Sequence, residues 1–341
     1  LFGDRMYIAN ATGCSSIWGN SSPSTPYTVN KQGRGPAWDN SLFEDNAEFG
    51  FGMFLAQKTL RGNLKDRLEK LAEADTSLKG ALDKWVETYD STLLNTDATA
   101  ELVEALNKNG SDAAKEILNN KDFLAKKSQW IFGGDGWAYD IGFGGLDHVL
   151  ASGEDVNVFV FNTEVYSNTG GQSSKATPTG AVAQFAAGGK EIKQKDLAAI
   201  AMSYGYVYVA QVSMGANMAQ LVKAISEAEA YHGPSLIIGY APCINHRIRV
   251  GMGKSIEEEK KAVQAGYWNL FRYNPAGGDK KFTLDSKAAT MPYREFLDGE
   301  ARYTALKKVN SEKAEALFDA AAKNAEKHYA YLEKLNDLYN K

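Results

Sequence analysis

Two short segments of this 341-residue sequence carry residue types that could bind a diphosphate and a metal ion. The first segment reads Gly-Gly-Asp-Gly-Trp at residues 133–137, and the second is Asn162-Thr163. Twenty-five residues lie between Gly136 and Asn162. Glycine lets the main chain turn tightly and approach a phosphate, and a helix that begins at such a turn offers free amides and the positive end of its dipole. Beside a diphosphate, Asp135 would be an oxygen ligand of Mg²⁺. Without one, Asp135 would be a helix cap, and the pattern would be a glycine-rich turn and an unrelated Asn-Thr pair.

Both segments directly follow predicted strands, so the fold can bring them together. Short runs rich in β-branched and aromatic residues alternate with helical stretches, and the runs are apolar on both faces. This pattern indicates an α/β fold, a buried parallel sheet sandwiched by helices, whose loops at the carboxyl ends of the strands bind ligands. The spacing of the two segments is then that of a thiamin diphosphate and magnesium site. The predicted strands are residues 129–132, 156–161, 206–212 and 236–240, with helices near 141–152, 195–204 and 216–231.

The remaining sequence divides into segments of different amino-acid composition. Residues 1–60 are rich in Gly, Ser, Asn and Pro and predict irregular but packed backbone. Residues 61–128 carry Lys, Glu, Leu and Ala at helical spacing. We expect one cofactor-binding domain made of residues 1–60 and 129–275, a helical insertion at 61–128, and a C-terminal extension at 276–341 that ends in a helical tail.

Composition limits the class of protein. Hydrophobic residues make up 44% and charged residues 23% of the sequence, which is ordinary for a soluble globular protein. The formal net charge is −4 with both signs interspersed, so no binding to nucleic acid is expected. No apolar stretch approaches the roughly 20 residues that span a bilayer, and the first residues do not form a signal peptide. Two cysteines do not make a secreted disulfide framework. We expect a cytoplasmic protein, and the lack of an initiator Met fits a chain cut from a longer one.

Longer stretches of the sequence resemble one enzyme family. They are Ala-Asn-Ala-Thr-Gly-Cys-Ser-Ser-Ile-Trp-Gly at residues 9–19, residues 133–148, residues 163–178 with Tyr-Ser-Asn-Thr-Gly-Gly-Gln at their centre, and Ala-Pro-Cys at 241–243. Together they resemble the C-terminal thiamin-binding domain of the long, fused pyruvate:ferredoxin (flavodoxin) oxidoreductases. The resemblance runs from residue 1 to about residue 275, and the insertion and the tail are less distinctive.

The resemblance implies a role for individual residues. Mg²⁺ would be held by Asp135, Thr163 and the main-chain carbonyl of Val165. Asn168 would lie near the reacting centre and contact the substrate, although Asn-Thr-Gly-Gly could also be only a turn. The residues expected around thiamin diphosphate are Cys14, Gly134, Asp135, Gly136, Trp137, Thr163, Glu164, Val165, Tyr166, Ser167 and Asn168.

The resemblance also implies an iron–sulfur cluster. Cys14 and Cys243 match two of the four cysteines that hold the proximal [4Fe–4S] cluster of the family, and the missing Cys-x-x-Cys pair is expected upstream of Leu1. We expect the two sulfurs to lie within about one cluster's width of each other, with thiamin diphosphate beside Cys14. The alternative is two buried free cysteines. His246 follows Cys243 closely but is expected to have a structural role, because a zinc site needs further ligands.

The implied activity is oxidative decarboxylation of pyruvate with coenzyme A, which gives acetyl-coenzyme A and carbon dioxide and passes electrons through clusters to ferredoxin or flavodoxin. The expected partners are the rest of the same polypeptide, which includes a pyrimidine-binding domain and ferredoxin-like domains, and a second copy in a homodimer. No nucleic acid or membrane partner is expected. Two alternatives stay open: a non-redox thiamin-dependent decarboxylase or synthase, and a catalytically silent assembly fragment. The two cysteines argue against the non-redox alternative.

Overall fold

The computed structural model describes residues 2–18, 29–31 and 33–340. The chain divides into two compact units. The first comprises residues 1–9, 26–39 and 49–130, and the second comprises residues 10–25, 40–48 and 131–341. The helical insertion expected at 61–128 falls within the first unit, and the two predicted diphosphate segments fall within the second.

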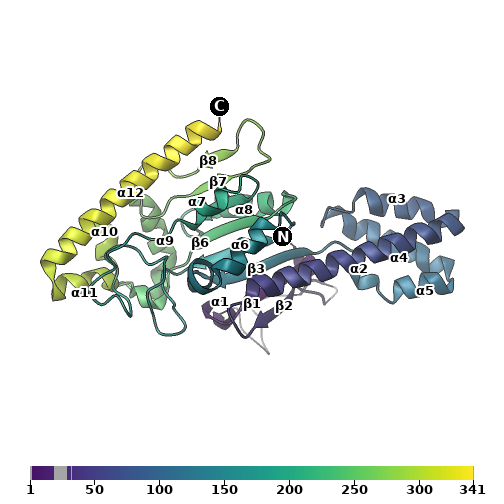
Figure 1. The fold of residues 1–341 in the computed structure, drawn as a ribbon, viewed down its shortest axis with the longest axis horizontal. Helices are drawn as coiled ribbons and strands as arrows, with labels where there is room; N and C mark the ends of the chain where they lie inside the picture. Colours follow the sequence, from purple (N-terminus) through teal and green to yellow (C-terminus); the bar gives the residue numbers. More distant parts are fainter. Residues whose placement is uncertain (1, 19–28, 32, 341) are drawn as a thin grey trace. The chain divides into compact units, whose positions relative to one another are not determined.

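The described residues form a mixed, mostly parallel sheet of eight strands in the order β2-β1-β3-β4-β6-β5-β7-β8 (Figure 1). At its centre β4 and β5 both run parallel to β6, and every residue of β6 is buried. This confirms the α/β class, and the four predicted strands begin and end within two residues of β3, β4, β5 and β6. The strands are β1 (Met6–Ala11), β2 (Ala37–Ser41), β3 (Ser128–Gly134), β4 (Asn157–Asn162), β5 (Tyr208–Val212), β6 (Ser235–Tyr240), β7 (Phe271–Tyr273) and β8 (Phe282–Leu284).

One edge of the sheet departs from the purely parallel prediction. β7 runs antiparallel to β5, and β8 runs antiparallel to β7. Each of these strands has three residues, which is too short for a periodic signal in the sequence. Phe271 and Phe282 stack with their ring centroids 5.3 Å apart, so packing fixes this edge.

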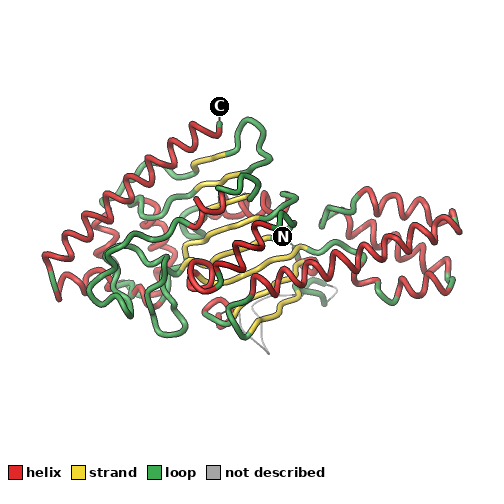
Figure 2. Tube along the Cα trace, viewed as in Figure 1, coloured by secondary structure: helices red, strands yellow, loops and turns green. Residues whose placement is uncertain are grey.

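Helices of the second unit, red in Figure 2, lie beside its strands, which are yellow. The helices α7 and α8 lie against β5 and β6, and each begins at a polar cap, Asp196 for α7 and Asn217 for α8. The predicted helical tail is α12, which packs against α11 and β8. The helices are α1 (Cys14–Trp18), α6 (Phe143–Ala151), α7 (Leu197–Met202), α8 (Met218–Ala230), α9 (Ser255–Gln264), α10 (Tyr293–Asp298), α11 (Ala301–Val309) and α12 (Ser311–Tyr339).

The first unit is a helical bundle with its own core. α2 begins at Asn46, so the prediction of irregular backbone up to residue 60 is wrong for its last part. Gly50 and Gly52 weaken the helical signal there, but a helix of 29 residues absorbs a cost of about 1 kcal/mol per glycine. Buried Leu, Ile and Trp side chains fill the core, including Leu68, Trp85 and Leu102. The helices are α2 (Asn46–Ala74), α3 (Lys79–Glu87), α4 (Leu94–Asn109) and α5 (Asp112–Leu118).

Arg61 is the polar centre of this bundle. Its guanidinium donates to the carbonyl oxygens of Leu124 and Tyr89 and to the side chain of Asn95, at 2.8–2.9 Å. We expect Arg61→Met to lower the free energy of unfolding by about 2–3 kcal/mol, because buried acceptors lose their donor. Urea unfolding followed by circular dichroism measures this. The control is Arg67→Met on the exposed face of α2, which should change the value by less than about 0.5 kcal/mol.

Among the described helices, none has both the length and the apolar character required to cross a membrane.

Candidate functional site

The Gly-Asp-Gly segment forms a tight turn at the end of β3. Asp135 follows the last strand residue, Gly134, and leads into a turn of π-helix at Gly136–Ile141 before α6 begins. A Cβ atom on Gly136 would lie 2.5 Å from ring carbons of Tyr166, a separation that real Cβ atoms do not adopt. Only glycine therefore fits at this position while Tyr166 keeps its place.

Three oxygen atoms of the two predicted segments converge beside this turn. The hydroxyl oxygen of Thr163 lies 2.8 Å from Oδ1 of Asp135 and 3.0 Å from the carbonyl oxygen of Val165. The single hydroxyl proton can be shared with only one of these two acceptors at a time. Neighbouring ligands of an octahedral Mg²⁺ ion, with bonds of about 2.0–2.1 Å, are about 2.9 Å apart. The two distances from the Thr163 hydroxyl oxygen therefore fit neighbouring ligands of that ion.

The charge of Asp135 also fits a cation. The carboxylate is fully buried, and it accepts hydrogen bonds from the main chain of Thr163 at 3.0 Å and from the hydroxyl of Ser174 at 2.5 Å. Burial raises the pKa of Asp135 to about 7, and the hydrogen bonds from Ser174 and Thr163 act in the opposite direction. Within the described residues no cationic side chain is paired with it. A buried carboxylate without a counter-charge is costly, and a bound cation would supply that charge.

The donor set distinguishes between metals. The described residues contain no group of three or more His, Cys, Asp or Glu side chains that could hold a metal ion. One carboxylate, one hydroxyl and one carbonyl are instead hard oxygen donors, which suit Mg²⁺ completed by phosphate and water, and not Zn²⁺.

A cavity of about 50 Å³ opens beside these oxygens. Typical small-molecule pockets measure about 300–1,000 Å³, so the described residues enclose too little space here for a whole ligand of that size. Sequence reasoning missed Glu44 in the lining, because an isolated Glu carries no motif signal. The expected residues that line the cavity are Gly134, Asp135, Gly136, Trp137, Thr163, Val165, Tyr166, Ser167 and Asn168.

Asn168 lies at the exposed tip of a closed loop that borders the cavity. The loop is closed by Tyr166 and Gln172, whose main-chain N–H and C=O groups are 2.8 Å apart. Gly170 and Gly171 complete the turn with φ values of 130° and 82°, which favour glycine. The turn interpretation therefore describes the backbone correctly, and the same turn also presents Asn168 to the cavity.

Glu164 does not point toward this cavity. Its carboxylate is fully buried and accepts hydrogen bonds from Arg302 and Tyr267, both at 2.7 Å. Its φ value is 61°, a left-handed conformation that is rare for residues other than glycine. The Glu164 side chain therefore belongs to the interior of the second unit, and the expected place of Glu164 around thiamin diphosphate stays a prediction.

Cys243 lies next to the same loop. Its buried sulfur accepts a hydrogen bond from the amide of Asn245 at 3.3 Å and contacts the hydroxyl oxygen of Ser167. The loops after β4 and β6 thus meet, as expected for neighbouring parallel strands. Cys14 begins α1, but its side chain lies outside the described part of the chain. The expected closeness of the two sulfurs therefore stays a prediction.

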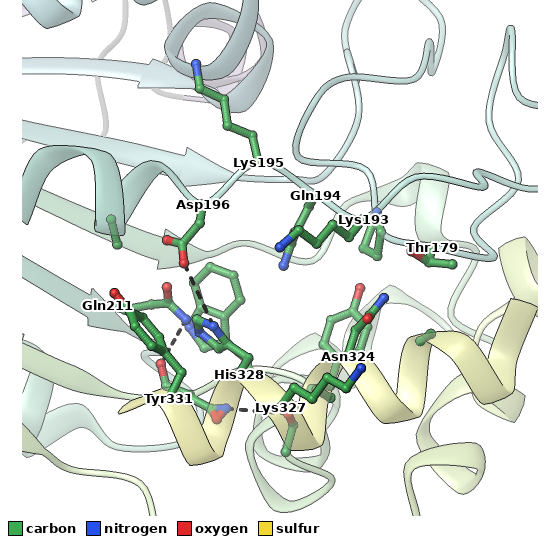
Figure 3. Close-up of a pocket in the computed structure, with 18 of the residues that line it drawn as sticks. Thr179, Lys193, Gln194, Lys195, Asp196, Gln211, Asn324, Lys327, His328 and Tyr331 are labelled. Carbon is green, nitrogen blue, oxygen red and sulfur yellow. Dashed lines mark hydrogen bonds and ion pairs between the residues drawn. The ribbon is translucent and has the colours of Figure 1, made fainter. Parts of the chain in front are cut away.

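The second unit also contains a larger cavity of about 500 Å³, shown in Figure 3, which none of the predicted site residues line. Residues of α12 face the segment at 193–196 across it, and Nδ1 of His328 lies 3.8 Å from Oδ2 of Asp196. Burial lowers the pKa of His328, and Asp196 acts in the opposite direction. Size alone does not identify the site, because the convergent oxygens and the exposed loop tip belong to the smaller cavity.

Comparison with known proteins shows which proteins the chain resembles. The family described as "Thiamine pyrophosphate enzyme, C-terminal TPP binding domain" matches residues 117–238. The chain is 58% identical to pyruvate:ferredoxin oxidoreductase of Moorella thermoacetica and 54% identical to pyruvate-flavodoxin oxidoreductase of Klebsiella pneumoniae, each over 98% of this chain. It is 52% identical, over 95% of its length, to mitochondrial pyruvate dehydrogenase [NADP(+)] of Euglena gracilis.

These relatives are much longer than the chain. The chain spans 30% of the Moorella protein, 29% of the Klebsiella protein and 18% of the Euglena protein. The chain therefore belongs to the pyruvate:ferredoxin (flavodoxin) oxidoreductase family, and it contains a thiamin diphosphate-binding domain.

Proposed function

We propose that this chain forms the diphosphate and magnesium half of a thiamin diphosphate site in an enzyme that oxidatively decarboxylates pyruvate. Coenzyme A would receive the acetyl group, carbon dioxide would leave, and electrons would pass through iron–sulfur clusters to ferredoxin or flavodoxin. The observation that supports this most is the convergence of the oxygens of Asp135, Thr163 and Val165 beside the glycine turn. The names of the relatives support the choice of substrate and acceptor.

Each residue of the site has a role in this proposal. Asp135, Thr163 and Val165 would hold Mg²⁺, and Gly134 and Gly136 would let the main chain approach the diphosphate. Bound thiamin diphosphate supplies the carbon nucleophile and the electron sink that decarboxylation requires. Trp137 and Tyr166 line the cavity and would exclude water from one side of the cofactor.

Other parts of the longer protein would complete the site. The cavity is too small for the whole cofactor, so the pyrimidine-binding domain would supply the opposite wall and the Glu that assists ionisation of the cofactor. Cys14 and Cys243 would provide two of the four thiolates of a [4Fe–4S] cluster, and the other two would come from outside this chain. The hydrogen bond from Asn245 to the sulfur of Cys243 is of the kind that tunes cluster potentials. We propose a homodimer with ferredoxin-like domains on the same polypeptide.

The test uses the full-length enzyme that contains this chain. With thiamin diphosphate, Mg²⁺, pyruvate and coenzyme A, it should reduce ferredoxin or flavodoxin and form acetyl-coenzyme A, and the purified protein should contain iron. A protein that consumes pyruvate without iron and without reducing an acceptor would be a non-redox decarboxylase. A protein without cofactor binding or turnover would be an assembly fragment.

Asn168 provides a separate prediction. In the full-length enzyme, Asn168→Ala should lower kcat with pyruvate about tenfold or more, as expected for the loss of a hydrogen bond made in the transition state, and should leave cofactor affinity nearly unchanged. The control is Gln172→Ala in the same loop, whose side chain accepts from the hydroxyl of Thr169 and donates to its carbonyl oxygen but does not line the cavity. Steady-state kinetics and calorimetric titration distinguish the two effects. Equal losses of turnover and cofactor affinity would show that Asn168 only shapes the turn.

A further inference from the structure

Four ionisable side chains form a fully interior group next to residues 163–167, which we call the metal loop because they include the proposed ligands Thr163 and Val165. We call Glu164, His246, Glu300 and Arg302 the buried charge cluster, and none of them is more than 3% exposed. Arg302 joins the two carboxylates, with Nη2 2.7 Å from Glu164 and Nε 2.6 Å from Glu300. The hydroxyl of Tyr267 adds a further donor to Glu164 at 2.7 Å.

One member of the buried charge cluster, Glu164, lies in the chain between two proposed metal ligands. Glu164 stands between Thr163 and Val165 in the chain, and its left-handed backbone persists only where the surroundings determine it strongly. The hydrogen bonds from Arg302 and Tyr267 are that determinant, because they fix the carboxylate in the interior. With Glu164 fixed inward, the groups on either side of it are directed to the cavity.

Another member of the cluster, His246, belongs to the turn that contains Cys243. His246 lies three residues after Cys243, and its Nε2 is 2.7 Å from the carbonyl oxygen of Thr163. Its Nδ1 is 3.5 Å from Glu300, the second carboxylate bonded to Arg302. The main chains of these segments are also joined, because the amide of Ala301 donates to the carbonyl oxygen of Arg247 at 3.0 Å.

We propose that Arg302 is a positioning residue that fixes the metal loop at 163–167 and the Cys243 turn in a single relative arrangement. This inference rests on the proposed magnesium and thiamin diphosphate site and on the proposed cluster at Cys243. Arg302 touches neither the cavity nor Cys243, so it acts through Glu164 on one side and through Glu300 and His246 on the other. Removing the guanidinium leaves two buried carboxylates without their shared cation, which would release both loops.

The chain contains a matched internal control. Arg272 on β7 likewise joins two carboxylates, Glu227 at 2.6 Å and Asp285 at 2.9 Å, and Glu227 also accepts from the hydroxyl of Tyr208. This second group also joins one guanidinium to two carboxylates, but it is only partly buried, with Glu227 25% and Asp285 14% exposed, and it does not line the small cavity. A general loss of stability on removing the guanidinium should therefore appear in both places.

The experiment compares Arg302→Met with Arg272→Met in the full-length enzyme. Calorimetric titration of thiamin diphosphate with Mg²⁺ should show about a 10–100-fold loss of affinity for Arg302→Met, the usual range for groups that support metal ligands. The electron paramagnetic resonance spectrum of the reduced proximal cluster should also change. Arg272→Met should lose stability but keep both the affinity and the spectrum. Arg302→Lys should bind the cofactor more tightly than Arg302→Met, because lysine keeps the charge but lacks the planar guanidinium that bonds both carboxylates.

A milder pair of variants covers the case in which the Met variants do not fold. Tyr267→Phe removes one hydrogen bond from Glu164, and Tyr208→Phe removes the equivalent one from Glu227. A loss of affinity confined to Tyr267→Phe supports the proposal. Equal effects in both members of each pair, or no effect of Arg302→Met and Tyr267→Phe, overturn it. If Asp135→Asn also binds the cofactor normally, the metal site itself is wrong, which separates that failure from failure of the positioning role.

Discussion

Asp135→Asn should lower the affinity of the full-length enzyme for thiamin diphosphate by more than about 100-fold in the presence of Mg²⁺, a larger loss than a supporting residue causes. Asp135 provides the only charged oxygen among the three that converge, and Asn would keep the shape without the charge. Calorimetric titration measures the loss. Treating the wild-type enzyme with a chelator should weaken binding similarly, because both changes remove the cation that joins protein and diphosphate.

A matched substitution shows that the effect is local. Asp147 lies on α6 and accepts from the hydroxyl of Tyr204 at 2.7 Å, outside the cavity. Asp147→Asn should bind the cofactor with nearly wild-type affinity. If Asp135→Asn binds as tightly as Asp147→Asn, the assignment of Asp135 as a metal ligand is wrong.

Gly136→Val should cause the second large effect. The added Cβ would lie 2.5 Å from the ring of Tyr166, which must then move out of the cavity lining. Overpacking of this kind costs about 1–3 kcal/mol, equivalent to about 5–150-fold in a binding constant if the strain falls on the bound state. Cofactor titration, together with thermal unfolding, measures both consequences.

Gly144 is the control for this substitution. It lies in α6, and a Cβ added there meets no atom within 4 Å. Gly144→Ala should therefore stabilise the protein by about 0.5–1 kcal/mol through helix propensity, with no change in cofactor affinity. Full cofactor affinity in Gly136→Val would mean that the position of Tyr166 does not matter for binding.

The central strands and the glycine turn could be predicted because their signals are local. Buried parallel strands appear as continuous apolar runs, and the turn requires small residues at fixed positions. The antiparallel edge formed by β7 and β8 could not be predicted, since three-residue strands carry no period. The early start of α2 at Asn46 was hidden by two glycines, whose cost a long helix outweighs.

Residues of the candidate site could be predicted from the sequence where they directly follow the end of a predicted strand. Asp135 and Thr163 follow strand ends, so the order of the strands brings them together, whereas the carbonyl of Val165 was implied only by the resemblance. The inward direction of Glu164 depends on Arg302, which is 138 residues away in the sequence. No spacing rule connects such a pair, and a resemblance in the motif cannot show on which side of the chain a carboxylate lies. The role of Cys14 depends on a side chain beyond the described residues.

The left-handed conformation of Glu164 has a consequence for changes in chain length. Residues 163, 164 and 165 face the cavity, the interior and the cavity in turn. Deleting or inserting one residue here would reverse these directions, placing a carboxylate beside the proposed diphosphate site and a threonine or valine against Arg302. Surface loops usually tolerate such changes in length, but this one should tolerate none. Natural variation in this family should therefore take the form of substitutions within a loop of fixed length.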